Sequence, residues 1–330
     1  MRSVLVTGGF GFIGSHLVER LLLTSTTRVH VVDNLTTSPI EVERFVRELP
    51  DTTRLTYDIG SVEAFCAKAS RPRFDEIYHL ASVVGPVGVL AHGGRIAGMM
   101  VNDTARVAAL AAEAGARLVD VSTSEVYGGG RDGYCSERDF KIIQPKVTIR
   151  LEYAVGKLAA EIALVNLTTV SGLSASIVRP FNVAGPRQSG KGGFVLPRFL
   201  TQAAAGEPLT VYGDGRMIRA FTHVADIAEG LMAVMERGRS GEAYNLGNPA
   251  NKTTILELAQ RVVRLTGSRS EIRFVDPKTL FGPLFEEAND KYPDADRSIH
   301  ELGWLPKHDL DQIIRDTAAF MRSEGDRSAR

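Results

Sequence analysis

Two short segments carry side chains whose types and spacing suit acid–base chemistry. The segment from Val121 to Gly128 contains the hydroxyl of Thr123 and the carboxylate of Glu125, and a second segment begins at Tyr153 and ends at Lys157. Tyr153 and Lys157 are four residues apart in an expected helix, so they share one face. A lysine beside a tyrosine favours the phenolate and lowers the tyrosine pKa. The pattern therefore predicts Tyr153 as a general base near neutral pH.

This set of side chains suits the removal of a hydride from a sugar carbinol. Tyr153 would take the hydroxyl proton, and Thr123 would hydrogen-bond the oxygen that becomes a ketone. Lys157 could also hold the ribose next to a nicotinamide. The structural alternatives are a surface helix pair for Tyr153 and Lys157 and a strand-end cap for Thr123. The glycine-rich amino terminus favours the chemical interpretation.

The segment Thr7-Gly-Gly-Phe-Gly-Phe-Ile-Gly14 lies between an expected strand and an expected helix. Glycines at this place permit a tight turn and let backbone N–H groups meet a pyrophosphate. Asp33 follows 19 residues after Gly14, at the end of the second expected strand, where it could bind a ribose diol. A carboxylate there would repel a 2′-phosphate, which favours NAD over NADP. The alternative is a glycine-rich turn without a ligand.

The composition limits the classes of protein to consider. The chain has 330 residues, is 44% hydrophobic and has a formal net charge of zero, which argues against binding nucleic acid through bulk positive charge. Its two cysteines, Cys66 and Cys135, form no CxxC pair, and its seven histidines show no ligand spacing, so we propose no disulfide framework and no metal site. No apolar run reaches the roughly 18 residues that a membrane span needs, and a strand is expected from Arg2. We expect a cytoplasmic protein that binds neither a membrane nor nucleic acid.

Strand-like and helical patterns alternate through the first half of the chain. We expect strands at Ser3–Thr7, Val29–Asp33, Arg54–Tyr57, Glu76–Leu80, Arg117–Ser122 and Ala175–Arg179, with helices at Ile13–Leu23, Ile96–Ala114 and Arg150–Val170. Apolar strands separated by helices predict an α/β protein with a doubly wound parallel Rossmann sheet. Residues 1–180 would bind NAD. Residues 181–330 would form a smaller mixed α/β substrate domain, with some segments returning to the first.

The second half of the chain has a different pattern. A helix should end at Gly206, and the runs Leu209–Tyr212 and Met217–Thr222, on either side of Gly213–Gly215, predict a hairpin. Further helices are expected at Val224–Arg237, Ile255–Thr266 and Leu310–Met321. This half should cap the carboxyl edge of the sheet. The glycine-rich loop 128–140 looks like a mobile lid.

Longer motifs identify a family resemblance. They include His79-Leu-Ala-Ser82, Arg179-Pro-Phe-Asn182, Gly185-Pro-Arg187, Pro208–Gly213, Arg219–Asp226 and Tyr244-Asn-Leu-Gly247. With the glycine loop and the Tyr153–Lys157 pair, the chain from Val4 to about Pro306 resembles the extended short-chain dehydrogenases/reductases that act on nucleotide sugars as epimerases, dehydratases or decarboxylases. The resemblance implies these cofactor-binding residues: Gly8, Gly11, Phe12, Ile13, Gly14, Asp33, Asn34, Asp58, Ile59, Leu80, Ala81, Ser82, Tyr153, Lys157 and Pro180.

The resemblance implies oxidation of a sugar to its 4-ketone by NAD, after which three outcomes compete. A 4,6-dehydratase usually carries an Asp where this chain has Ser124, which is a poor general acid. A 4-epimerase usually lacks a residue like Glu125. UDP-glucuronate decarboxylases (UDP-xylose synthases) resemble the chain best, through Thr-Ser-Glu-Val-Tyr-Gly at 123–128 and the Arg-Ala-Phe run from Arg219. The product would be UDP-xylose or UDP-4-keto-xylose.

Within this family, Glu125 would act as a base or proton shuttle near C-5 of the sugar, or alternatively as a cap for the following loop. Arg219 would hold a carboxylate or diphosphate. The substrate-binding residues implied are Ser124, Asn182, Arg187, Val211, Tyr212 and Arg219. Two departures fall near the sugar: Glu152-Tyr-Ala-Val155 replaces Cys-Tyr-Asp-Glu, and Val83–Gly88 replaces a Pro/Ser-rich loop.

Two expectations concern partners. The resemblance implies a homodimer in which the helices at 96–114 and 150–170 pair across a two-fold axis as a four-helix interface. A different class of protein, an NAD-binding regulator without catalysis, stays open. It predicts a broken catalytic set, whereas Thr123, Tyr153 and Lys157 are all present.

Overall fold

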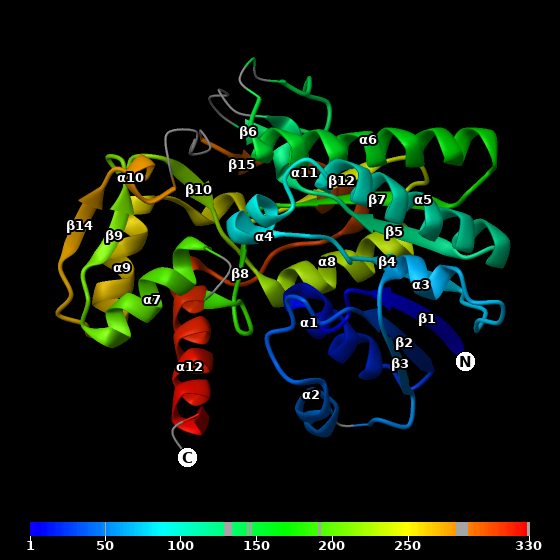
Figure 1. The fold of residues 1–330 in the computed structure, drawn as a ribbon, viewed down its shortest axis with the longest axis horizontal. Helices are drawn as coiled ribbons and strands as arrows, with labels where there is room; N and C mark the ends of the chain where they lie inside the picture. Colours follow the sequence, from blue (N-terminus) through cyan, green and yellow to red (C-terminus); the bar gives the residue numbers. More distant parts are fainter. Residues whose placement is uncertain are drawn as a thin grey trace.

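The computed structural model describes residues 1–49, 51–128, 134–143, 145, 147–190, 193–281 and 290–328. Its centre is a seven-stranded parallel sheet (Figure 1) in the order β12-β7-β5-β4-β1-β2-β3. The strands are β1 (Arg2–Thr7), β2 (Thr27–Asp33), β3 (Leu55–Ile59), β4 (Glu76–His79), β5 (Arg117–Val121), β7 (Ala175–Pro180) and β12 (Ala243–Leu246). The strand order reverses between β1 and β4, which creates a ligand crevice at the carboxyl ends. The predicted Rossmann fold class is confirmed.

Alternation along the strands explains why helices cover both faces of the sheet. In β1, Val4 and Val6 belong to one buried cluster and Leu5 to the other, because successive side chains point to opposite faces. Figure 1 shows α5 and α6 on one side and α1 and α8 on the other. The helices of the first half, together with α8, are α1 (Phe12–Leu22), α2 (Val42–Glu48), α3 (Val62–Cys66), α4 (Gly85–Ala91), α5 (Ile96–Ala114), α6 (Ile149–Val170) and α8 (Val224–Arg237).

Helix α6 has the length and composition of a membrane span, which differs from our expectation. It contains an 18-residue window with a mean hydropathy of 1.2, of which 39% is buried in the structure. Two features mark it as a core helix here. Ala160 and Leu164 are buried, and Gly156 lies so close to α5 that an added Cβ would be 2.6 Å from Cα of Ala97.

The second half contains a cluster built from α7 (Val195–Ala205), α9 (Ile255–Thr266) and α12 (Leu310–Ser328). The predicted hairpin is wrong: β9 (Leu209–Tyr212) pairs in parallel with β14 (Ile272–Val275), and β10 (Ile218–Ala220) pairs with β13 (Lys252–Thr254). The start of α9 explains this, because Ile255 and Leu256 donate backbone hydrogen bonds to Met217 and Gly215. Carbonyl groups at and after the turn therefore bond to the start of α9 and not to a hairpin partner strand.

The remaining elements are short and link the two halves. Strand β8 (Val183–Ala184) pairs with β11 (Thr222–His223), and β6 (Tyr134–Cys135) pairs with β15 (Tyr292–Pro293). Helices α10 (Lys278–Phe281) and α11 (Asp296–Leu302) complete the chain before α12. Residues 129–133 of the expected lid loop lie outside the described residues.

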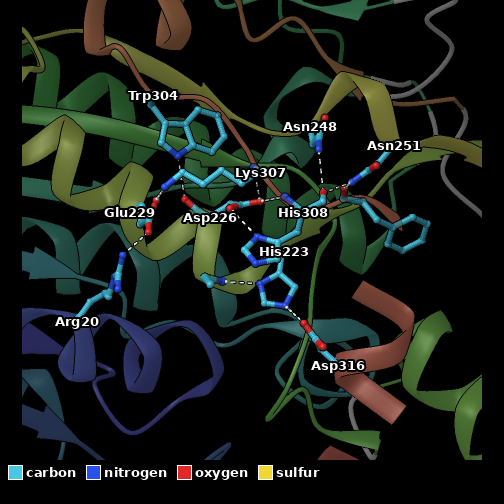
Figure 2. A network of polar contacts seen from close by, with 12 residues as sticks. Arg20, His223, Asp226, Glu229, Asn248, Asn251, Trp304, Lys307, His308 and Asp316 are labelled. Carbon is cyan, nitrogen blue, oxygen red and sulfur yellow. Dashed lines mark hydrogen bonds and ion pairs between the residues drawn. The ribbon is translucent and has the colours of Figure 1, made fainter. Parts of the chain in front are cut away.

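A buried carboxylate fastens the carboxyl-terminal segment to the sheet domain (Figure 2). Asp226, near the start of α8, accepts backbone N–H bonds from Lys307 and His308 at 3.1 Å each and pairs with Nδ1 of His308 at 2.8 Å. The His308 ring stacks on His223 with 4.1 Å between centroids, and Nε2 of His223 lies 3.4 Å from Asp316 on α12. The network therefore positions the segment before α12, and α12 itself, next to the start of α8.

Replacement of Asp226 with Ala should lower the free energy of unfolding by about 3 kcal/mol, because it leaves buried N–H donors without an acceptor. Asp316→Ala is the matched control, since Asp316 is one-third exposed and its contact with His223 is long. It should cost less than about 1 kcal/mol. Urea unfolding of both variants measures the difference. Equal effects would show that Asp226 does not fasten this segment.

Candidate active site

A cavity of about 1210 Å³ lies at the carboxyl ends of the strands. It is bounded by the glycine loop, the ends of β4, β5 and β7, helix α6 and parts of the second half. Most of the residues predicted from the sequence line it: Gly8, Gly11, Phe12, Ile13, Gly14, Asp33, Asn34, Leu80, Ala81, Ser82, Thr123, Ser124, Glu125, Tyr153, Lys157, Pro180, Asn182, Tyr212 and Arg219. The fold thus brings together residues that are up to 211 positions apart in the sequence, from Gly8 to Arg219.

Two of the residues that we expected to bind the cofactor, Asp58 and Ile59, do not line this cavity. The carboxylate of Asp58 accepts a hydrogen bond from Lys68 at 2.6 Å and faces His30. Ile59 is 53% exposed. The cavity wall after β3 is formed instead by residues 60–63, because the strand ends at Ile59 and the chain then turns into α3.

Two expected substrate-binding residues also have other positions. Arg187 has a positive φ of 67°, donates to Glu19 of α1 at 2.9 Å and covers the ring of Phe45. It therefore ties the second half to the sheet domain. Val211 is fully buried in the α7–α9–α12 cluster, because alternation along β9 directs it away from the side of Tyr212.

The glycine loop is shaped so that only hydrogen fits at its key positions. A Cβ on Gly14 would lie 2.0 Å from the carbonyl oxygen of Gly8, and a Cβ on Gly8, where φ is 71°, would lie 2.8 Å from the Ala81 nitrogen. Asp33 supports this loop by accepting N–H bonds from Phe10 at 2.9 Å and Leu35 at 2.8 Å. Because these glycines carry no side chain, the backbone at the start of α1 can approach a dinucleotide pyrophosphate closely.

The proposed catalytic pair is buried at the end of β5. Nζ of Lys157 donates to the carbonyl of Val121 at 2.8 Å, and Tyr153 and Thr123 share a hydrogen bond. Burial raises the pKa of Tyr153 to about 12, although the hydrogen bond with Thr123 lowers it. The prediction of a depressed tyrosine pKa is therefore wrong, and Lys157 contacts the backbone instead of the phenol.

Glu125 is held by two cations that the sequence reasoning missed. Nε and Nη2 of Arg150 donate to one carboxylate oxygen at 2.9 and 2.8 Å, and Nζ of Lys291 forms an ion pair with the other. Although burial opposes ionisation, Lys291 and Arg150 hold the Glu125 pKa well below its usual range. The two cations therefore favour ionised Glu125 and make it a weak base, which does not fit the predicted role as base or proton shuttle.

The two missed cations differ in how readily sequence could reveal them. Arg150 lies three residues before Tyr153, one helical turn away, so helical spacing offered a signal. Lys291 is 166 residues from Glu125, and no local pattern connects them. A third missed cation, Arg198, lines the cavity and covers the ring of Tyr212 at 3.9 Å, which makes this pair a candidate surface for a nucleotide base.

The fold and the site define a dinucleotide-dependent enzyme of the Rossmann type. The model of the NAD dependent epimerase/dehydratase family matches residues 4–247. The chain is 37% identical over 309 residues to UDP-glucuronic acid decarboxylase 2 of Arabidopsis thaliana, covering 94% of this chain and 66% of that protein. It thus spans just under two thirds of that relative. It belongs to the NAD-dependent epimerase/dehydratase family and is an enzyme.

Two further comparisons agree with this assignment. UDP-N-acetyl-alpha-D-glucosaminuronate decarboxylase of Bacillus cytotoxicus is 31% identical, covering 97% of this chain and 98% of that protein. The crystal structure of a UDP-glucose 4-epimerase of Thermotoga maritima, solved with UDP-glucose, superposes with a TM-score of 0.85 at 26% identity. The superposed region covers 98% of this chain and 99% of the epimerase chain.

The residues that line the cavity would hold NAD, and its nicotinamide supplies a hydride acceptor when bound. Gly8, Gly11 and Gly14 leave room for the pyrophosphate, and Asp33 lies where a ribose is expected. Lys157 and Tyr153 lie at the other end, beside Thr123, where a substrate hydroxyl would lose its proton.

Tyr153→Phe should reduce turnover by about 10²- to 10⁴-fold, because it removes the group that accepts the hydroxyl proton. NAD affinity should stay unchanged, since the ring still fills the cluster with Val89, Ile96 and Met100. Tryptophan fluorescence or calorimetry with NAD⁺, together with a steady-state assay, separates the two effects. A fully active variant would show that another group is the base.

Proposed function

We propose that this enzyme decarboxylates a UDP-linked uronic acid, with UDP-glucuronate as the best candidate. The observation that carries the proposal is the pair of cations, Arg150 and Lys291, that hold the single carboxylate of Glu125, with the charge of Arg219 acting on Lys291. Among the described residues, the two cations that contact Glu125 leave an excess of one positive charge near Tyr153. Such an excess favours a substrate with a carboxylate and a diphosphate. The names of the 31% and 37% identical relatives support the same reaction.

The chemistry needs little from the protein once the ketone forms. Tyr153 accepts the proton of the sugar 4-hydroxyl while the hydride leaves, and Thr123 hydrogen-bonds the new carbonyl. The 5-carboxylate is then that of a β-keto acid, which loses carbon dioxide without a general acid at C-6. The cations hold the carboxylate in place beforehand. Reprotonation at C-5 and return of the hydride would give UDP-xylose, and release before that return would give UDP-4-keto-xylose.

Two features support decarboxylation over dehydration. Elimination of a 6-hydroxyl needs a proton donor near C-6, but Ser124 is a poor acid, and Glu125 carries no proton because its pKa is held low. Epimerisation at C-4 is the second candidate, favoured by the structural similarity to a 4-epimerase. It needs Thr123, Tyr153 and Lys157 but no group like the Glu125 cluster.

The direct test is mass spectrometry of the products after incubation with NAD⁺ and UDP-glucuronate, with UDP-N-acetylglucosaminuronate in parallel. Loss of the mass of carbon dioxide from either acid supports the proposal, and a further loss of two hydrogens identifies the 4-keto product. Chromatography must resolve the 4-epimers, because epimerisation leaves the mass unchanged. Conversion of UDP-glucuronate to UDP-galacturonate alone would replace decarboxylase by epimerase.

The charge of Lys291 makes a pH-dependent prediction. Burial lowers the pKa of Lys291 to about 8, so its ammonium is present below that pH and lost above it. The KM for the acidic sugar should therefore rise as the pH increases past about 8. Lys291→Arg should remove this rise, because a guanidinium stays charged. Lys291→Met should have a high KM at every pH. Identical KM profiles for wild type and both variants would rule out the role of this charge.

We also propose that two copies of the chain pair through α5 and α6. The outer faces of these helices expose Met99 (39%), Val155 (36%) and Ile162 (55%), and two such faces would bury each other as a four-helix interface. Light scattering should give a dimer for the wild type and a monomer for Ile162→Glu. Leu23→Glu is the control, since Leu23 is 62% exposed but lies beyond α1. A wild-type monomer would contradict the proposal.

A further inference from the structure

Asn245 of strand β12 is a fully buried residue whose side-chain amide joins three remote segments. Its Oδ1 accepts a hydrogen bond from the hydroxyl of Tyr127 at 2.7 Å. Its Nδ2 donates to the carbonyl of Cys135 at 2.7 Å and to that of Asp294 at 3.0 Å. These partners lie in the short 3-10 helix Ser124–Tyr127, in β6 and directly after β15.

The segments that Asn245 joins carry both partners of the ion pair between Lys291 and Glu125. Glu125 lies two residues before Tyr127 in the 3-10 helix, and Lys291 comes directly before β15. Strand β15 pairs with β6 in parallel, so the hydrogen bond to β6 also supports β15. One amide therefore fixes the backbone near each partner of the ion pair.

Asn245 is itself held from several sides. Its backbone N–H donates to Glu137 at 2.7 Å, and its carbonyl accepts a hydrogen bond from the Ser298 hydroxyl at 2.6 Å. The Tyr127 hydroxyl also accepts a hydrogen bond from Arg179 at 3.0 Å. A flipped amide would place its oxygen against two carbonyl groups, so the hydrogen bonds specify one orientation.

The position of the Lys291 ammonium depends on this support. A lysine has a flexible four-carbon stem, so its charge lies where the main chain and its partners hold it. The backbone N–H of Lys291 makes a long hydrogen bond of 3.3 Å to Ile218. On its carboxyl side, the chain is held through β15 and the amide of Asn245. Lys291 is 3% exposed, so a displaced ammonium would lose its countercharge without gaining water.

We propose that Asn245 is a positioning residue, which holds Lys291 against Glu125 and so keeps positive charge where an acidic substrate binds. The need for that charge rests on the proposed function. The placement of Lys291 by Asn245 does not depend on which reaction follows.

The kinetic test compares Asn245→Ala with wild type, using UDP-glucuronate. The KM should rise about tenfold and kcat should fall less than about threefold, because the variant weakens the binding of the substrate and leaves Tyr153 and Lys157 in place. Ser298→Ala is the matched control. It removes a buried hydrogen bond to the backbone carbonyl of Asn245 and should leave both constants unchanged.

A double-mutant cycle tests the placement without any turnover. Urea unfolding is measured for Asn245→Ala, Lys291→Met and the double variant. Lys291→Met should change the unfolding equilibrium constant about tenfold less in the Asn245→Ala background than in wild type, because the ion pair is already weakened there. The same cycle between Ser298→Ala and Lys291→Met should show no coupling.

The outcomes separate this inference from the proposed function. If no sugar acid is converted but Asn245 and Lys291 are coupled, the inference about placement stands and the decarboxylase proposal falls. If turnover is found and the coupling is absent, the inference falls alone. Should Asn245→Ala fail to fold, Tyr127→Phe replaces it in the cycle, since it removes the hydrogen bond on the Glu125 side and keeps the ring. Absence of coupling there would overturn the inference.

Discussion

Pairing of charges in a site that excludes water is the constraint on which this structure depends. Two sets of ion pairs lie near the carboxyl ends of β5 and β7: Glu125 with Arg150 and Lys291, and Arg179 with Glu161. Each would be strongly unfavourable if one partner were missing. Arg179 and Glu161 join the sheet to α6, and Lys291 brings in the second half, so assembly of the site is coupled to the packing of all three parts.

Lys291 shows how the second half takes part in this assembly. It precedes β15, whose pairing with β6 fixes the chain beside the loop that follows β5. The backbone of Lys291 bonds to Ile218, while its side chain reaches Glu125. Arg219, next along β10, faces the same cavity. The second half thus supplies positive charge to a site whose proton acceptor and hydride site belong to the first half.

Local patterns were sufficient for the parts of the fold that are determined locally. The expected strands of the first half agree with the observed ones to within two residues at each end, and α5, α8 and α9 have the expected bounds, because burial on both faces gives apolar strands and capped amphipathic helices. The hairpin at Gly213–Gly215 failed because α9, 40 residues on, supplies its partners. The role of Glu125 failed for the same reason: Lys291 is remote in sequence. The wrong expectations concern contacts between residues that are far apart in the sequence. Local hydrophobic patterns carry no information about such contacts.

The pKa of Tyr153 links these observations to catalysis. A buried phenol with a pKa of about 12 is almost entirely protonated at neutral pH, so its burial opposes a role as a base. Glu125 makes ionisation harder, because its negative charge raises the tyrosine pKa, and Arg150 and Lys291 reduce that effect by neutralising it. What remains to favour the tyrosinate is positive charge brought near the ring, and Lys157 is the protein group placed to provide it.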